Sequence, residues 1–272
     1  MFYCCGITDK GVMSHNEDAL LIGGKVCTDG SCIEKLRAPF IIAVSDGVSG
    51  ELSGEVASKM GLENIAEISY SSATDLRGEL SGIHRMIAEY SAGQPETRNM
   101  QATLCGIAFD ENGHVLSFNV GDSRLYRYRS GRLKQLTKDQ SFVQLLYEEG
   151  TITLEQRRTH VHRNIIFPAF GNANAKPQID ILDIGCMEYG DVLILCTDGL
   201  SDYVSPLDIE EIMELPKSLP RRLELLRDKA LEKGGEDNIT AAAVVYCGEY
   251  HSRSFPNNRT ITERKIYYDY TR

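Results

Sequence analysis

The chain has 272 residues, of which 42% are hydrophobic and 25% charged, and these values suit one large globular domain with a well-filled core. Its net charge of −10 disfavours a protein that binds a nucleic-acid backbone, because such proteins gain affinity from basic surface. No apolar run reaches membrane-spanning length, and the N-terminus lacks a basic segment followed by an apolar one, so we expect a cytoplasmic protein.

The N-terminal segment predicts strands separated by polar stretches. Phe2–Thr8 is a short apolar run, and Ala19–Ile22 is a second one. Glu17 and Asp18 directly precede the second run, and in an extended segment they point to opposite faces, so only one of them can face the core. Residues 23–39 are expected to form a polar loop.

Two apolar runs from distant parts of the chain end in the same way. Residues 41–44 lead into Ser45-Asp46-Gly47, and residues 192–196 lead into Thr197-Asp198-Gly199. Asp-Gly between apolar runs is typical of a hairpin, but a helical pattern follows each time, beginning with Ser49-Gly50-Glu51 in the first case. We therefore expect the two strand-end aspartates to be halves of one site. Gly47 would let the backbone pass close to whatever Asp46 binds.

The remaining sequence predicts further helices and strands. Apolar residues recur with helical spacing at Val56, Met60, Ile65 and Ile68, and again at Leu76, Leu80, Ile83 and Ile87. Strands are expected at 102–109, 115–120, 125–128, 179–184, 192–196 and 239–246, and helices at 138–149, from 153, at 207–215 and at 220–232. Asn112-Gly113 predicts a hairpin turn, and Thr153 with Gln156 predicts a capping box.

Six carboxylates lie at strand ends or in glycine turns, namely Glu17, Asp18, Asp46, Asp122, Asp198 and Asp237. They cannot all be buried without cations, because desolvating an ionised carboxylate is too costly. None of the 8 cysteines forms a Cys-x-x-Cys pair, so oxygen ligands and a hard ion such as magnesium or manganese are favoured. A carboxylate that bridges two ions, with a shared water, is an arrangement that attacks phosphoryl centres. With no phosphate-loop or nucleophile-elbow motif present, hydrolysis at a two-metal site is the chemistry that these residues allow.

Five short motifs closely resemble those of the metal-dependent type 2C serine/threonine protein phosphatases. They are Asn16-Glu17-Asp18, Ser45-Asp46-Gly47, Gly121-Asp122-Ser123-Arg124, Thr197-Asp198-Gly199 and Asp237-Asn238. Each motif alone is weak, but together they follow the family order and span roughly Gly6 to Cys247. The stretches 136–141 and 160–164, with Gly150 between them, resemble the bacterial members in particular.

The resemblance implies an α+β fold, a four-layer α-β-β-α sandwich of two antiparallel sheets flanked by helix pairs. Residues 1–248 would form the phosphatase domain, with a mobile flap at about 140–171 beside the site, and residues 249–272 a C-terminal tail. The implied substrate is a phosphorylated protein, with the enzyme opposing a serine/threonine kinase. We expect a monomer that binds neither nucleic acid nor membrane.

The resemblance also implies roles for the acids. Asp46 would bridge two manganese or magnesium ions, whereas Asp198 and Asp237 would hold one of them and the Gly47 carbonyl the other. These three aspartates would be the catalytic set, acting through a metal-bridging water.

Three further acids would support the ions. Glu17 and Asp18 would support the second ion, directly or through water. Asp122, together with Asp198, would hold a weaker third ion, as in bacterial members of the family.

The sequence departs from the family pattern just before Asn16. The family has an arginine there that grips the substrate phosphate, but residues 11–15 contain none. His15 is a candidate donor in its place, although a lone histidine is more often an ordinary surface or core residue. The histidine that some members carry after the Asp-Gly is replaced by Val48, as in bacterial relatives.

Two other functions remain open at the level of sequence. A catalytically impaired relative could act as a binding scaffold, but such a copy has no reason to keep Asp46, Asp198 and Asp237 together. A hydrolase of small phosphate esters is equally compatible with the acid set, because substrate choice lies in the flap and the surface.

Overall fold

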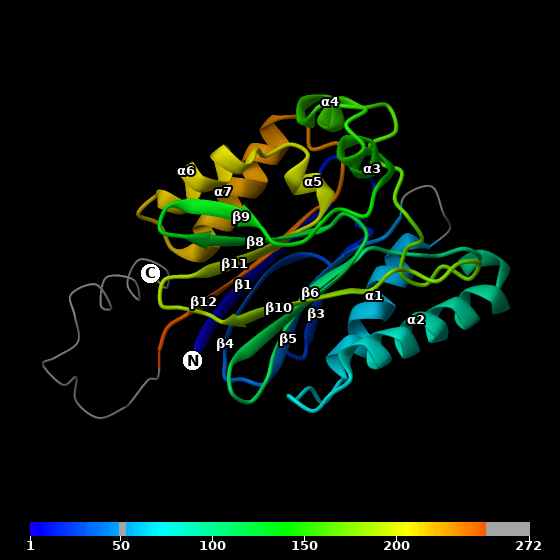
Figure 1. The fold of residues 1–272 in the computed structure, drawn as a ribbon, viewed down its shortest axis with the longest axis horizontal. Coiled ribbons are helices and arrows are strands. Elements are labelled where there is room, and N and C mark those ends of the chain that lie inside the picture. The colour runs from blue at the N-terminus through cyan, green and yellow to red at the C-terminus, as the bar shows by residue number, and fades with distance from the viewer. Residues whose placement is uncertain (49–52, 249–272) are drawn as a thin grey trace, which may run out of the picture.

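Two antiparallel sheets of six strands pack face to face in a computed structural model that describes residues 1–48 and 53–248 (Figure 1). The first sheet has the order β4-β1-β12-β11-β8-β9 and the second β10-β7-β6-β5-β2-β3. The strands of the first sheet are β1 (Phe2–Asp9), β4 (Gly30–Leu36), β8 (Arg124–Arg129), β9 (Arg132–Gln135), β11 (Val192–Cys196) and β12 (Ile239–Tyr246). Those of the second are β2 (Asp18–Ile22), β3 (Lys25–Cys27), β5 (Phe40–Asp46), β6 (Leu104–Phe109), β7 (His114–Val120) and β10 (Asp180–Cys186).

Helices cover the outer face of each sheet. The helix pair α1 (Gly54–Ala66) and α2 (Leu76–Gly93) packs on the second sheet, and α6 (Pro206–Glu214) and α7 (Leu219–Glu232) pack on the first (Figure 1). The shorter helices α3 (Phe142–Glu148), α4 (Leu154–Thr159) and α5 (Asp198–Ser201) lie toward one end of the sandwich, and η1 (Pro95–Thr97) follows α2. The expected α-β-β-α layering is confirmed. None of the described helices combines the length and the apolar character needed to cross a membrane.

The layers enclose three apolar cores. One core lies between the two sheets and includes Phe109, and one lies between each sheet and its helix pair. Strand β12 is buried along nearly its whole length, because it is paired on both edges and covered on both faces. Strands of this kind read as continuous apolar runs, which explains why their positions could be predicted from the sequence.

The polar edge strands were not predicted. Residues 23–39 are not a loop, because they contain β3 and β4, and β9 was also missed. Strand β4 is an edge strand with alternating exposure, and β9 is an edge strand with charged residues facing water. Edge strands commonly carry charged and polar residues, which gives them the composition of a loop.

Several local predictions can be compared directly with the structure. Gly113 has a φ of +80° in the turn between β6 and β7, as expected at Asn112-Gly113. The capping box of Thr153 and Gln156 is present at the start of α4. Helix α3 starts at Phe142 rather than at residue 138, because the side chain of Ser141 caps it by accepting a hydrogen bond from the Gln144 amide. The expected helix start at 49–51 and the tail at 249–272 lie outside the described residues.

Candidate metal centre

The predicted acids converge at one end of the sandwich. Asp18 opens β2 and Asp46 ends β5, and the two residues are direct partners in the antiparallel register. Asp198 is the first residue of α5, immediately beyond β11, and its carboxylate is close enough to that of Asp46 to raise the pKa of Asp46. The structure therefore brings the two strand-end Asp-Gly motifs together. Asp122 lies between β7 and β8, and Asp237 lies just before β12.

Burial makes this site unfavourable for ionised carboxylates. It raises the pKa of Asp18 to about 7, and the nearby charges of Asp198 and Asp237 act in the same direction. Burial and the Asp237 carboxylate likewise raise the pKa of Asp198 to about 7. The pKa values of Asp46 and Asp122 are also raised, first by burial and then by neighbouring aspartates. Without a cation, these groups must share protons at neutral pH.

The donor set fits divalent cations. The Oδ1 atoms of Asp18 and Asp198 are buried, and neither has a hydrogen-bond partner among the described residues. A buried carboxylate oxygen without a partner is costly, and a bound cation removes that cost. Clustered carboxylate and carbonyl oxygens are the ligands that magnesium and manganese prefer.

Threonines from both sheets fix the backbone and side chains of the acids. Thr197 Oγ1 donates to Asp18 Oδ2 at 2.9 Å and accepts from the Thr240 amide at 3.1 Å. The Asp46 amide donates to Thr103 Oγ1 at 3.1 Å, while the Thr103 amide donates to the Asp46 carbonyl at 2.7 Å. Because these threonines lie on or beside buried strands, they hold the carboxylates in place before any ion binds.

Asn238 joins the N-terminal loop to the strand end that carries Asp237. Its Oδ1 accepts from the Glu17 amide at 2.7 Å, and its Nδ2 donates to the carbonyls of Lys10 and His15, each at 3.0 Å. The side chain of Asp18 is buried, whereas that of Glu17 is partly open, as the alternation of an extended segment predicts.

His15 is hydrogen-bonded to Glu17. His15 Nε2 lies 2.8 Å from Glu17 Oε1, and its Nδ1 lies 2.9 Å from Ser14 Oγ, while 58% of the side chain remains exposed. Ligand atoms of His15, Glu17 and Glu55 all lie within 4.8 Å of one another. Glu55 was not predicted, because an acid in the first turn of a helix is ordinary and gives no separate signal.

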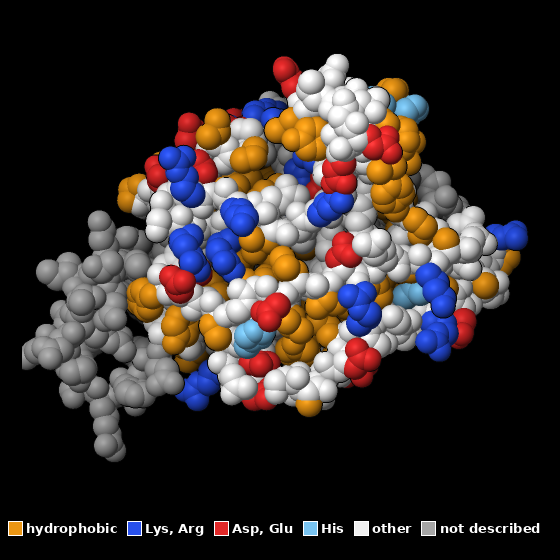
Figure 2. Space-filling view, viewed as in Figure 1, with side chains coloured by type: hydrophobic (Ala, Val, Ile, Leu, Met, Phe, Trp, Pro, Cys, Tyr) orange, Lys and Arg blue, Asp and Glu red, His pale blue; other side chains and the backbone are white. Residues whose placement is uncertain are grey.

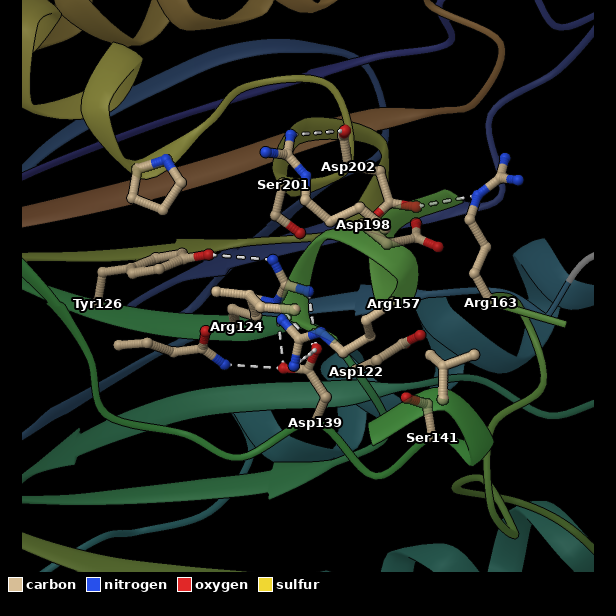
Figure 3. A pocket seen from close by; sticks show the side chains of 15 residues that line it. Asp122, Arg124, Tyr126, Asp139, Ser141, Arg157, Arg163, Asp198, Ser201 and Asp202 are labelled. Atoms are coloured by element: carbon tan, nitrogen blue, oxygen red, sulfur yellow. Dashed lines mark hydrogen bonds and ion pairs between the residues drawn. The ribbon is translucent and has the colours of Figure 1, made fainter. Parts of the chain in front are cut away.

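A pocket of about 230 Å³ extends the site toward residues of the predicted flap (Figure 3). Asp122 and Asp198 line it together with Arg157 and Arg163. Arg163 Nε lies 3.5 Å from Asp202 Oδ2, so a flap residue reaches the end of α5. Asp202 was not predicted, and the only available signal was its position one helical turn after Asp198.

A buried ion pair forms the wall of this pocket. Arg124 donates to Asp139 through Nε at 3.0 Å and through Nη2 at 2.7 Å (Figure 3). Asp139 also accepts from the Gln135 side chain at 2.7 Å. Because both hydrogen bonds go to Asp139, these N–H groups of the Arg124 guanidinium are not available to bind a substrate.

Two glycines allow close backbone contacts around the acids. A Cβ at Gly199 would lie 2.0 Å from the Asn238 carbonyl oxygen, and one at Gly47 would lie 2.4 Å from the Gly54 carbonyl carbon. Both distances are far below any real Cβ contact. Glycine at these positions therefore brings α5 against the Asp237 loop, and β5 against the start of α1.

The replacement Gly199→Ala should lower the free energy of unfolding by about 3 kcal/mol or more, because the clash is with backbone that cannot rotate away. Urea unfolding followed by circular dichroism measures this change. Gly82→Ala is the matched control, because Gly82 lies within α2 and nothing lies within 4 Å of its added Cβ. That control should stabilise the protein by about 1 kcal/mol. Equal effects of the two replacements would contradict the close contact at Gly199.

Comparison with known proteins places this site in a family. The sequence model of protein phosphatase 2C matches residues 18–233. The serine/threonine phosphatase stp of Listeria welshimeri is 31% identical over 247 residues, which cover 87% of this chain and 93% of the relative. The chain belongs to the protein phosphatase 2C family. The matched residues include four of the predicted acids, Asp18, Asp46, Asp122 and Asp198, whereas Asp237 lies just beyond them.

Other phosphatases share both sequence and fold with this protein phosphatase 2C member. The serine/threonine protein phosphatase PstP of Mycobacterium tuberculosis is 34% identical over 242 residues, covering 86% of this chain and 43% of PstP. A crystal structure of PstP/Ppp from that organism matches with a TM-score of 0.75 at 30% identity, covering 90% of this chain and 99% of that chain. The catalytic domain of PstP in complex with 2 manganese ions matches with a TM-score of 0.72 at 29% identity, again covering 90% and 99%.

Proposed function

We infer that this protein is a metal-dependent serine/threonine protein phosphatase that hydrolyses phosphoserine and phosphothreonine on proteins. The observation that carries the inference is the convergence of buried aspartates whose unpartnered oxygens require cations. Family membership supports the reaction, and the manganese ions in the related PstP domain support the choice of metal.

The proposed ligand set is the one that the sequence indicated, namely Glu17, Asp18, Asp46, the Gly47 carbonyl, Asp122, Asp198 and Asp237. When bound, divalent ions would act as Lewis acids on the phosphoryl group and supply a nucleophilic water at neutral pH. The chain itself contributes fixed positions, because Thr197 and Thr103 restrain Asp18 and Asp46. Preorganised groups of this kind need not reorganise during the reaction.

The flap at 140–171 is proposed as the wall against which the phosphorylated segment binds. Its Arg163 is exposed and lies beside Asp202 at the pocket. Residues 1–248 would form the phosphatase domain, acting as a monomer in the cytoplasm and opposing a serine/threonine kinase.

A pure scaffold is the less favoured function. Scaffolding requires no cluster of buried acids, and such a cluster destabilises the protein when no cation is present. The complete aspartate set therefore argues for catalysis.

The deciding experiment is phosphate release from phosphoserine, phosphothreonine and phosphotyrosine peptides and from a small phosphate ester, with manganese in each case. We expect rapid release from the first two peptides and slow release from the others. A preference for the small ester would favour the alternative hydrolase.

The missing arginine leads to a prediction about substrate affinity. Met13→Arg should lower the KM for a phosphothreonine peptide by about tenfold with kcat nearly unchanged, because a charge-assisted hydrogen bond contributes roughly 1.5–3 kcal/mol. Met13 is partly exposed in the loop that precedes Glu17, so the new side chain has room.

Two further variants separate the possible phosphate donors. If His15 donates a hydrogen bond to the phosphate, His15→Ala should raise KM. Ile33→Arg adds the same charge on the edge strand β4, which contributes no residue to the pocket, and should leave KM unchanged. If Met13→Arg and His15→Ala both leave KM unchanged, Arg163 becomes the leading candidate.

A further inference from the structure

Two thiols flank a direct contact between the sheets. Cys27 lies on β3, an edge strand of the second sheet, and Cys32 lies on β4, an edge strand of the first. Their strand partners are Leu20 and Gly6, respectively. A Cβ at Gly6 would lie 2.4 Å from Leu20 Cδ2, so these two partners touch across the sandwich. Cys27 and Cys32 consequently approach each other at the open edge.

The two side chains are neighbours. The Cys27 thiol is close enough to affect the pKa of the Cys32 thiol, and both residues pack into the core between the sheets. Cys32 is 2% exposed, whereas Cys27 is partly open to solvent. Simple apolar packing accounts for a buried cysteine. It does not account for an accessible cysteine beside a second thiol.

The chain between the two cysteines is short and turns sharply. Thr28, Asp29, Gly30 and Ser31 connect them, and Gly30 has a φ of +78°. The loop that a bond between the thiols would close is thus already formed in the reduced protein. Ring closure costs little additional chain entropy in this case.

We propose that Cys27 and Cys32 form an oxidisable dithiol that a low-molecular-weight disulfide converts into a disulfide bond joining the two sheets. The Cys27 thiolate first attacks one sulfur of the small disulfide, which forms a mixed disulfide and releases one thiol. The Cys32 sulfur then attacks the Cys27 sulfur and displaces the second thiol. Two electrons and the two thiol protons pass from the protein to the small disulfide, which leaves as two thiols.

The environments of the two thiols set the order of these steps. Cys27 is the entry point because it is the accessible member of the pair. Burial, followed by the neighbouring Cys27, raises the pKa of the Cys32 thiol to about 11, so little thiolate is present there at neutral pH. The second step is therefore the slow one, and it accelerates as pH rises.

The bond would also act on the metal centre. The Thr28 carbonyl accepts from Asn16 Nδ2 at 2.9 Å, and Asn16 Oδ1 accepts from the Asp18 amide at 3.2 Å. Pulling Cys27 onto Cys32 displaces Thr28 and thus loosens the contact that orients Asp18. Oxidation raises the manganese concentration for half-maximal activity by about tenfold, the scale of losing an outer-shell partner of a metal ligand. This effect on activity rests on the proposed function, whereas formation of the bond does not.

The test is to incubate the full reduced chain with glutathione disulfide, block free thiols by alkylation and digest with trypsin. Cys27 and Cys32 fall in one tryptic peptide, residues 26–35, and Cys4 and Cys5 fall in another, residues 1–10. We expect peptide 26–35 to carry no alkyl group and to have lost two hydrogen atoms, with reversal by dithiothreitol. Alkylation of both of its cysteines, a lasting mixed disulfide, or a cross-link to peptide 1–10 would overturn the proposal.

Variants separate the steps and test the link to the metals. Cys32→Ser should trap the mixed disulfide on Cys27, whereas Cys186→Ser, which removes an exposed cysteine, should leave the internal bond unaffected. A manganese titration of the oxidised and reduced protein then measures the shift, which should be absent in Cys32→Ser. An unchanged manganese requirement despite complete bond formation would overturn the coupling to Asp18. If the reduced protein shows no phosphatase activity with any manganese concentration, the proposed function fails, and the peptide masses still decide whether the dithiol forms.

Discussion

Asp198→Asn should reduce kcat by about 10²–10³-fold or more, the scale seen when one preorganised charge-stabilising group is removed from an active site. Asp198 lies beside Asp46 and has a buried oxygen that no described residue satisfies. An amide at this position would bind a divalent ion far less well, because it carries no charge. The measurement is manganese-dependent phosphate release from a phosphothreonine peptide.

Stability distinguishes loss of function from loss of fold in this variant. Above pH 7 the ionised Asp198 carboxylate destabilises the metal-free protein, so the neutral amide should leave its free energy of unfolding unchanged or higher. Asp122→Asn should slow turnover less, because Asp122 is proposed to hold only the weaker third ion. Asp183→Asn is the control, since Asp183 is exposed on β10 and its Oδ1 contacts only the Gly185 amide and His114 Nε2 among the described residues, contacts that the asparagine oxygen can keep, and it should change neither quantity. Normal turnover in Asp198→Asn would show that the metal centre has been misassigned.

The strand-end acids could be predicted because their signal is local. An apolar run followed by Asp-Gly predicts a strand and places an aspartate at its end. Asp46 and Asp198 both follow this pattern. Asp122 and Asp237 were predicted from their glycine-containing turns, and the resemblance then supplied their roles. Central strands such as β5 and β11 are buried on both faces, so their apolar runs are continuous and unambiguous.

The missed features depend on contacts between distant residues. Strands β3, β4 and β9 have loop-like composition, and they are strands only because β2, β1 and β8 pair with them. Asp202 and Glu55 lie next to the site because the fold places helices α5 and α1 there. The hydrogen bond between His15 and Glu17 depends on a loop conformation that Asn238 fixes from the other end of the chain. No periodicity or local motif encodes these contacts.

Removal of divalent metal should abolish phosphate release completely, and addition of manganese should restore it. When bound, the ions would supply the Lewis acidity and the nucleophilic water, whereas the described residues of the site offer mainly carboxylates, which would repel a phosphate. Phosphate release is measured after exhaustive dialysis against chelator and again after manganese is added back. Activity that persists undiminished in the chelated protein would end the two-metal interpretation.

Metal removal should also change how stability depends on pH. In the metal-free protein, the pKa values of Asp18 and Asp198 are raised from 3.8 to about 7, so between these values the folded state binds more protons than the unfolded chain. The free energy of unfolding should therefore fall as pH rises from about 4 to about 7, by up to about 1.4 kcal/mol per pH unit for each proton.

Bound manganese should remove this slope, because a cation beside the carboxylates keeps them ionised in the folded state as they are in the unfolded chain. Urea unfolding at several pH values, with manganese and with chelator, gives the difference between the two curves. Asp18→Asn in the chelated protein serves as the internal comparison. It removes one titrating carboxyl group, so the free energy of unfolding should depend less steeply on pH. Parallel curves with and without manganese would mean that these acids do not hold the ion.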